Sequence, residues 1–99
     1  MERWYDYRDL KHASRWALVD LQETFNFTPP LELSWYTMKL SAQLHRACSC
    51  LTEKDLELIS EPTKKVIARV VDPSKRIFNA KASRMWEKFI HDQRTKMIR

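Results

Sequence analysis

Glycine is absent from this 99-residue chain. Glycine normally supplies the positive φ angles of tight hairpin turns, and it lets a backbone approach bound phosphate closely. Its absence therefore disfavours a sheet joined by tight turns. It also argues against a glycine-rich nucleotide loop and against the glycine elbow that presents a catalytic serine. Because most familiar catalytic motifs are missing, we expect the protein not to be an enzyme.

Long apolar runs and a cysteine framework are missing as well. No run approaches the roughly 18 to 20 apolar residues that a membrane helix needs, and residues 1–6 lack the apolar block of a signal peptide. The two cysteines, Cys48 and Cys50, have a single residue between them, which is a poor spacing for a structural disulfide. We therefore expect a cytoplasmic protein in a reducing compartment, without a membrane partner.

The composition is nevertheless that of a folded chain. Hydrophobic residues make up 43% of the sequence and aromatic residues 11%, which is too apolar for a disordered protein even with 31% charged residues. A chain of this length buries roughly 60 to 65% of its unfolded surface around one modest core. We therefore expect a single helical domain over residues 1–99.

Prolines and capping residues divide the chain into helical blocks. From about Trp4 to Phe25 the apolar residues recur every three or four positions, which predicts one amphipathic helix. Thr28 followed by Pro29 resembles a cap with a first-turn proline, and it predicts a second helix from there to about Leu51. This second helix has a wide apolar face, so we expect it at the centre of the core.

The third block is also marked by a cap and a proline. Thr52 and Asp55 have the spacing of a capping box, which predicts a short turn over residues 53–60. Pro62 interrupts the block, so a second segment over residues 61–71 follows the turn.

Asp72 and Pro73 repeat the arrangement of a cap and a first-turn proline. They predict a long basic amphipathic helix from about Ser74 toward the C-terminus, with Trp86 and Ile90 at one edge of its core face. The predicted fold is all-α, a small single-domain bundle of four helices, or of five if the third block is two helices.

Charge is distributed unevenly along the sequence. Residues 1–61 hold seven Lys or Arg against ten Asp or Glu, whereas residues 62–99 hold eleven against three. The first part therefore carries −3 and the second +8, which gives the net charge of +5. Clustered positive charge attracts polyanions and releases their counterions on binding.

We predict that the basic part binds nucleic acid, with DNA favoured over RNA, and that the protein is a non-enzymatic regulator. The candidate residues are Lys64, Lys65, Arg69, Lys75, Arg76, Lys81, Arg84 and Lys88. Three alternatives remain open: the basic residues form an ordinary solvated helix face, they bind an acidic protein surface, or they bind an anionic membrane surface.

One pattern is similar to the buried and turn positions of helix-turn-helix motifs. It consists of Ile67, Ala68, Val71, Ser74 and Phe78. This resemblance implies that the C-terminal helix is the recognition helix, with Lys75, Arg76 and Asn79 near its start and able to reach phosphates or base edges. Helix capping explains the same junction without DNA, so both interpretations stay open.

His45, Cys48 and Cys50 are the one cluster of candidate metal ligands in the sequence. A structural zinc site generally needs four ligands with paired spacing, and no second cysteine pair is present. Cys48 lies one helical turn from two leucines, where a thiol packs as a small apolar group. A Cys and His pair also suggests a nucleophile, but no orienting group or oxyanion donor can be named. We expect neither a metal nor a cofactor.

Tryptophans are numerous, with four in the chain. Trp35 and Trp86 fit the core faces of their helices, whereas Trp4 and Trp16 lie off the apolar stripe of the first helix. Together with Val19, these two would form an apolar patch suited to another protein or to a second copy in a homodimer. The alternative function is therefore a small adaptor, inhibitor or subunit that binds a protein.

Overall fold

The computed structural model of the chain describes residues 10–26, 38–75 and 78–97. Over these ranges the backbone forms four α-helices and one short 3₁₀ helix, and no strand. This confirms the predicted all-α class, and the four α-helices of these ranges match the predicted bundle of four. The elements are α1 (Leu10–Phe25), α3 (Leu40–Ser49), η2 (Asp55–Leu58), α4 (Glu61–Val70) and α5 (Ala80–Met97).

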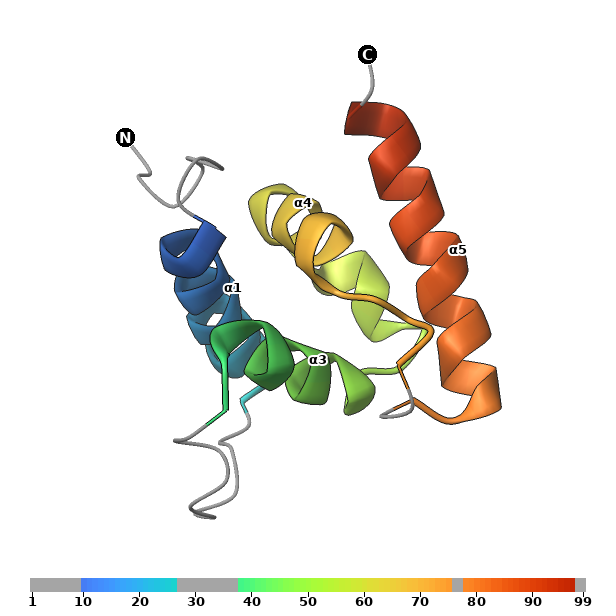
Figure 1. Cartoon of the computed structure of the whole chain (residues 1–99), viewed down its shortest axis with the longest axis horizontal. Helices are drawn as coiled ribbons and strands as arrows, with labels where there is room; N and C mark the ends of the chain where they lie inside the picture. The colour runs from blue at the N-terminus through green and yellow to red at the C-terminus, as the bar shows by residue number, and fades with distance from the viewer. Residues whose placement is uncertain (1–9, 27–37, 76–77, 98–99) are drawn as a thin grey trace.

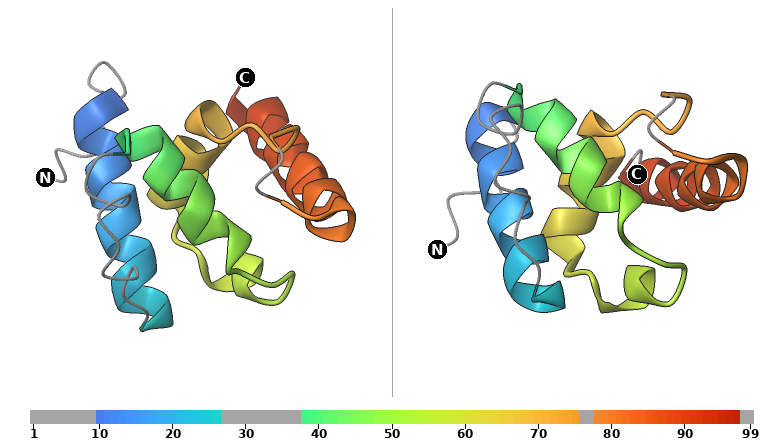
Figure 2. Two further views of the ribbon diagram at one scale, coloured as in Figure 1. Left: turned by 60° about the horizontal axis from the view of Figure 1, so that its bottom comes forward. Right: turned by 90° about the horizontal axis from the view of Figure 1, so that it is seen from below.

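The central element of the arrangement is α4. It packs against α1 on one side and against α5 on the other, and α1 also packs against α3 (Figure 1). The two views of Figure 2 agree that α4 separates α5 from α1. All four helices contribute side chains to one hydrophobic core. Both α4 and the described part of the second predicted helix, α3, contribute three of the buried core residues.

The apolar stripe of α1 is buried as its spacing predicts. Ala13, Ala17 and Leu21 are fully buried, and the two alanines leave room for the neighbouring helices to approach closely. The helix ends at Phe25, and the next residue, Asn26, has φ 51°. Glycine usually occupies this left-handed conformation, and asparagine is the residue that tolerates it best in a chain without glycine. The predicted start of this helix, residues 4–9, lies outside the described residues.

The prediction of one continuous helix from Pro29 to Leu51 is wrong. Lys39 is extended, with φ −63° and ψ 152°, and α3 begins after it. Gln43 fixes this entry, because its backbone N–H donates to the Lys39 carbonyl and its side-chain Nε2 to the Met38 carbonyl, each at 3.0 Å. The apolar spacing continues across the break, so periodicity alone does not reveal it. Residues 29–37 of the predicted helix lie outside the described residues.

The capping box of the third block is confirmed. The Thr52 N–H donates to Asp55 Oδ2 at 2.8 Å, and the Asp55 N–H donates to Thr52 Oγ1 at 3.4 Å. The short helix η2 follows, and α4 begins at Glu61 with Pro62 in its first turn. The two pieces of this block are therefore separate elements, as their sequence predicts.

The predicted start of the last helix is wrong, because α5 begins at Ala80 and not near Ser74. Asp72 forms a local turn in which its Oδ1 accepts the Ser74 N–H at 3.0 Å and the Ser74 hydroxyl at 2.7 Å. These bonds lower the pKa of Asp72. Asn79 is the actual cap, since its Oδ1 accepts the Ala82 N–H at 2.7 Å.

Phe78 accounts for the late start of α5. Its ring is buried between the rings of His45, with centroids 5.9 Å apart, and Trp86, at 6.0 Å. Residues 71–75, 78 and 79 lie outside the helices, so α4 and α5 are not joined by the turn of about three or four residues that is typical of a helix-turn-helix motif. The helix-turn-helix arrangement implied by the resemblance is not formed.

The core face of α5 includes the predicted Phe89 and Gln93, which are buried, but its centre is shifted toward the edge at which the sequence places Trp86 and Ile90. Trp86 is fully buried and Ile90 is 3% exposed, whereas Ala82 and Met85 are only partly buried. The reason is that α5 packs mainly against α4, so the residues facing α4 become the centre of its face. The core role of Trp86 is confirmed, and Trp35 lies outside the described residues.

Two hydrogen-bond groups fasten α4 to its neighbours. At its start, Asp20 of α1 accepts the Thr63 hydroxyl at 2.6 Å and the Ser60 hydroxyl at 3.0 Å. At its end, Arg94 of α5 donates from Nε to the Ala68 carbonyl at 2.7 Å. That carbonyl belongs to the last helical turn, where intrahelical donors are missing.

Within the described residues, no helix combines the length and the apolar character that crossing a membrane requires.

Candidate functional site

The outer face of α5 carries the basic stripe that the sequence predicts. Lys81, Arg84 and Lys88 follow one another at spacings of three and four residues, and all three are exposed. They extend over about 10 Å of helix and lie away from the buried Trp86. Asp92 is also exposed, one turn after Lys88, and it limits the stripe at its C-terminal end. We call these three cations the α5 stripe.

The α5 stripe lies in the first half of its helix. The positive end of the helix dipole is at Ala80, so it adds to the positive potential of the side chains. Lys75 is exposed in the turn that precedes Phe78. Arg76 lies outside the described residues.

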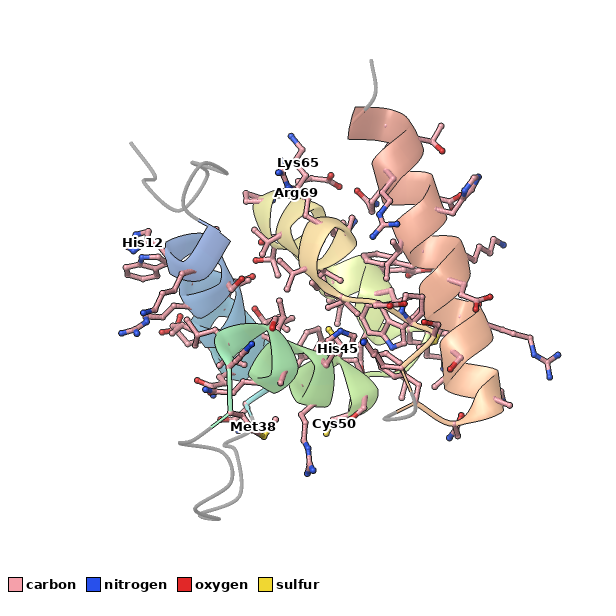
Figure 3. The ribbon with its side chains drawn as sticks, in the orientation of Figure 1. His12, Met38, His45, Cys50, Lys65 and Arg69 are labelled. Atoms are coloured by element: carbon pink, nitrogen blue, oxygen red, sulfur yellow. The ribbon has the colours of Figure 1, made fainter. Side chains whose placement is uncertain are left out.

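The basic residues of α4 differ from one another. Lys65 and Arg69 are exposed, one turn apart, and project together from this helix (Figure 3). Lys64 is mostly buried, with 16% of its side chain exposed, and its Nζ pairs with Glu61 Oε1 at 3.1 Å. Because this pair balances its charge locally, Lys64 adds less to an anion-binding surface than the sequence suggests.

A hollow of about 650 Å³ lies where α1, the start of α3 and the end of α4 meet. Its cationic lining consists of Lys11, Arg15, Lys39 and Arg69, and none of the described residues that line it is acidic. We call it the basic hollow. Arg69, one of the predicted cations, therefore lines this hollow together with three cations that were not predicted.

Sequence reasoning missed Lys11, Arg15 and Lys39 because it counted charge over long stretches. All three belong to the part of the chain whose net charge is −3. One local signal was present: Lys11 and Arg15 are four residues apart and so share a face of α1. Nothing in the sequence indicates that Lys39 and Arg69 meet that face.

Comparisons with protein-family models, with curated proteins and with solved structures give no match to this chain. The case for a function therefore rests on the chain's own residues.

The predicted aromatic patch is described only in part. Trp16 is 45% exposed, and its Nε1 donates to His12 Nε2 at 2.9 Å. The two rings meet edge to face, with centroids 6.1 Å apart. Val19 is half-buried, and Trp4 lies outside the described residues.

The cluster around His45 has a packing role in the structure. His45 projects from α3 toward the chain that leads to α5 (Figure 3), and its Nε2 accepts the Asp72 N–H at 2.9 Å. Cys48 is fully buried, and burial raises the pKa of its thiol. The exposed Cys50 places its Sγ 3.6 Å from the Arg46 carbonyl. Among the described residues, no three His, Cys, Asp or Glu side chains are grouped as metal ligands would be.

Proposed function

We propose that the protein is a non-enzymatic regulator that binds nucleic acid through the α5 stripe. One observation carries the proposal: Lys81, Arg84 and Lys88 are all exposed on one face of a helix whose opposite face is anchored in the core. Such a face can contact successive phosphates without any rearrangement of the fold. The contacts are electrostatic, so we assign no base sequence to them.

DNA is the proposed target in preference to RNA. The major groove of B-DNA, about 12 Å wide, admits an α-helix, whereas the major groove of A-form RNA is too narrow. Asn79 is not available to read bases as the sequence resemblance implied, because its side chain caps α5. The proposal is therefore binding to the phosphate backbone, with Lys75 and Lys65 as secondary contacts.

The test compares two variants with the same change of net charge. The first replaces the α5 stripe (Lys81→Gln, Arg84→Gln and Lys88→Gln). The control replaces three exposed cations elsewhere (Arg46→Gln, Lys54→Gln and Lys96→Gln). With a labelled DNA duplex in fluorescence anisotropy, we expect the first to weaken binding by roughly tenfold or more and the control to retain most of it. Equal losses in the two variants would remove the proposal.

A second candidate function is binding to a protein through α1, and the exposure of Trp16 favours it. The partner would be another protein or a second copy of the chain. Light scattering after size exclusion reports a homodimer directly, and Trp16→Ala should then dissociate it. The absorbance ratio at 260 and 280 nm of protein purified without nuclease separates this candidate from nucleic-acid binding.

A further inference from the structure

The side of α1 that faces away from the core carries a second set of side chains at helical spacing. His12, Trp16, Val19 and Glu23 follow one another at intervals of four, three and four residues, so they lie on one face of the helix. Figure 3 shows His12 on the side of α1 that points away from α4. We call these four residues the α1 outer face. Their spacing is the one by which two helices pack against each other along a seam.

Trp16 is the apolar anchor of this face, with 45% of its surface exposed. Its Nε1 donates to His12 Nε2 at 2.9 Å, and the two rings meet edge to face. The polar atom of the indole is therefore satisfied within α1, so a partner can cover the ring without leaving a donor unpaired. The hydrogen bond also holds the ring in one orientation, which reduces the entropy that is lost on association.

The residues around Trp16 differ between the two halves of the helix. Val19 is half-buried and lies one turn after Trp16, so it extends the apolar surface along the helix. The exposed charged residues of α1 are Lys11 and Arg15 in its first half and Glu23 in its second half. The exposed charge of α1 therefore changes sign along the helix.

A second copy of the chain, with its α1 antiparallel, complements this face. When the two-fold axis lies midway between Trp16 and Val19, the Trp16 side chain of each copy meets Val19 of the other, and Glu23 meets His12 of the other. The positive half of each helix then faces the negative half of the other. A parallel pair would instead bring Glu23 beside Glu23 and Arg15 beside Arg15, and like charges repel. We propose that the α1 outer face is the interface of an antiparallel homodimer.

The size of the contact sets the expected strength of this dimer. The α1 outer face covers about three turns of each helix, which is small for a protein–protein interface. We therefore expect a dissociation constant on the order of 100 μM. The proposal rests on the second candidate function, which is protein binding through α1, and it is independent of the α5 stripe.

The first experiment measures the mass of the full chain by light scattering between about 10 μM and about 1 mM, a range that brackets the expected constant. The wild-type mass should rise with concentration toward that of a dimer. Trp16→Ala should raise the dissociation constant by roughly tenfold or more, because it removes the central ring. The matched control is Leu58→Ala, which truncates an exposed apolar side chain of η2 and should leave the constant unchanged.

The second experiment determines the orientation by cross-linking with a short bismaleimide. It uses the background Cys50→Ser, which removes the exposed native thiol. Lys11 and Gln22 lie on the same side of α1, and in the antiparallel register Lys11 of one copy is within about one turn of Gln22 of the other. The two copies of Lys11 are then about 20 Å apart along the helix axis. A mixture of Lys11→Cys and Gln22→Cys should therefore cross-link, and each variant alone should cross-link much less.

The possible results separate this proposal from the second candidate function. A chain that remains monomeric at about 1 mM would overturn the proposal even if Trp16 binds a different protein, in which case the second candidate function alone would stand. A dimer that Trp16→Ala leaves intact, or that Leu58→Ala weakens equally, would have its interface elsewhere, and this too would overturn the proposal. Efficient cross-linking of each cysteine variant to itself would show a parallel pair and overturn the antiparallel arrangement.

Discussion

His45 connects α3 to the chain before α5 through one hydrogen bond to the Asp72 N–H. Since its Nε2 accepts this bond, the neutral ring carries its proton on Nδ1, which is buried and has no partner among the described residues. Desolvation lowers the pKa of His45 from its usual 6.5, the Asp72 carboxylate opposes this shift, and Lys75 adds to it.

This lowered pKa predicts a pH dependence of stability. The unfolded chain binds the proton of His45 more readily than the folded chain does. The contribution of His45 to the free energy of unfolding is therefore complete above about pH 6.5 and is lost as the pH falls through the lowered pKa. Urea denaturation should therefore show a wild-type protein that is less stable at about pH 5 than at about pH 7.5. The variant His45→Leu should show a smaller difference between the two. An unchanged difference would show that other groups cause the effect.

Asp20 predicts a coupling between α1 and α4. The variant Asp20→Ala leaves the fully buried Thr63 hydroxyl without its acceptor, and we expect a loss of about 1–3 kcal/mol in the free energy of unfolding. Thr63→Val removes the donor. In a double-mutant cycle, the loss of stability in the double variant should be smaller than the sum of the two single losses by about 0.5–3 kcal/mol. Additive losses would mean that the two side chains do not interact.

At the scale of elements, the start of α5 depends on Asn79. The variant Asn79→Ala should lower the free energy of unfolding by about 1 kcal/mol, because the Ala82 N–H loses its acceptor. Hydrogen exchange should show faster exchange of that amide. The matched variant Asp72→Ala, at the residue that the sequence pattern favours as the cap, should leave the Ala82 amide protected. Faster exchange in Asp72→Ala alone would place the helix start at Ser74 instead.

The starts of the helices differ in whether the sequence alone predicts them. Thr52 and Asp55 bond to each other within one turn, so their spacing in the sequence is sufficient to identify them. Asp72 and Asn79 are both suitable caps, and the choice between them depends on the burial of Phe78 against His45, a residue of α3. No local pattern contains that contact.

At the scale of the whole molecule, the affinity for DNA should depend on the number of phosphates neutralised. Each neutralised phosphate contributes about −0.9 to the slope of log K against log salt concentration, so the α5 stripe should contribute about −2.7. Anisotropy titrations between about 50 and 200 mM salt measure this slope. The α5-stripe variant should lose that contribution, whereas the control at Arg46, Lys54 and Lys96 should retain it. A slope that is unchanged in the α5-stripe variant would show that residues outside the α5 stripe neutralise the phosphates.

The distribution of charge is also a property of the whole molecule. Residues 62–99 carry +8, but Lys64 pairs with Glu61 and Arg94 donates to the Ala68 carbonyl. These two cations therefore make contacts within the protein that stabilise its fold. The acidic part of the chain in turn supplies three of the four cations of the basic hollow. A charge count along the sequence therefore predicts the α5 stripe and misses the hollow.

The sequence by itself determined the helical class, the buried stripe of α1, the end of α1 at Phe25 and the exposed α5 stripe. These features depend on residues within one or two turns of each other, and spacing in the chain is then equivalent to spacing in space. Tertiary structure decided the extended Lys39, the start of α5 and the meeting of Lys11, Arg15, Lys39 and Arg69. These features depend on how separate helices pack, and that packing is fixed by buried contacts between residues that are distant in the chain.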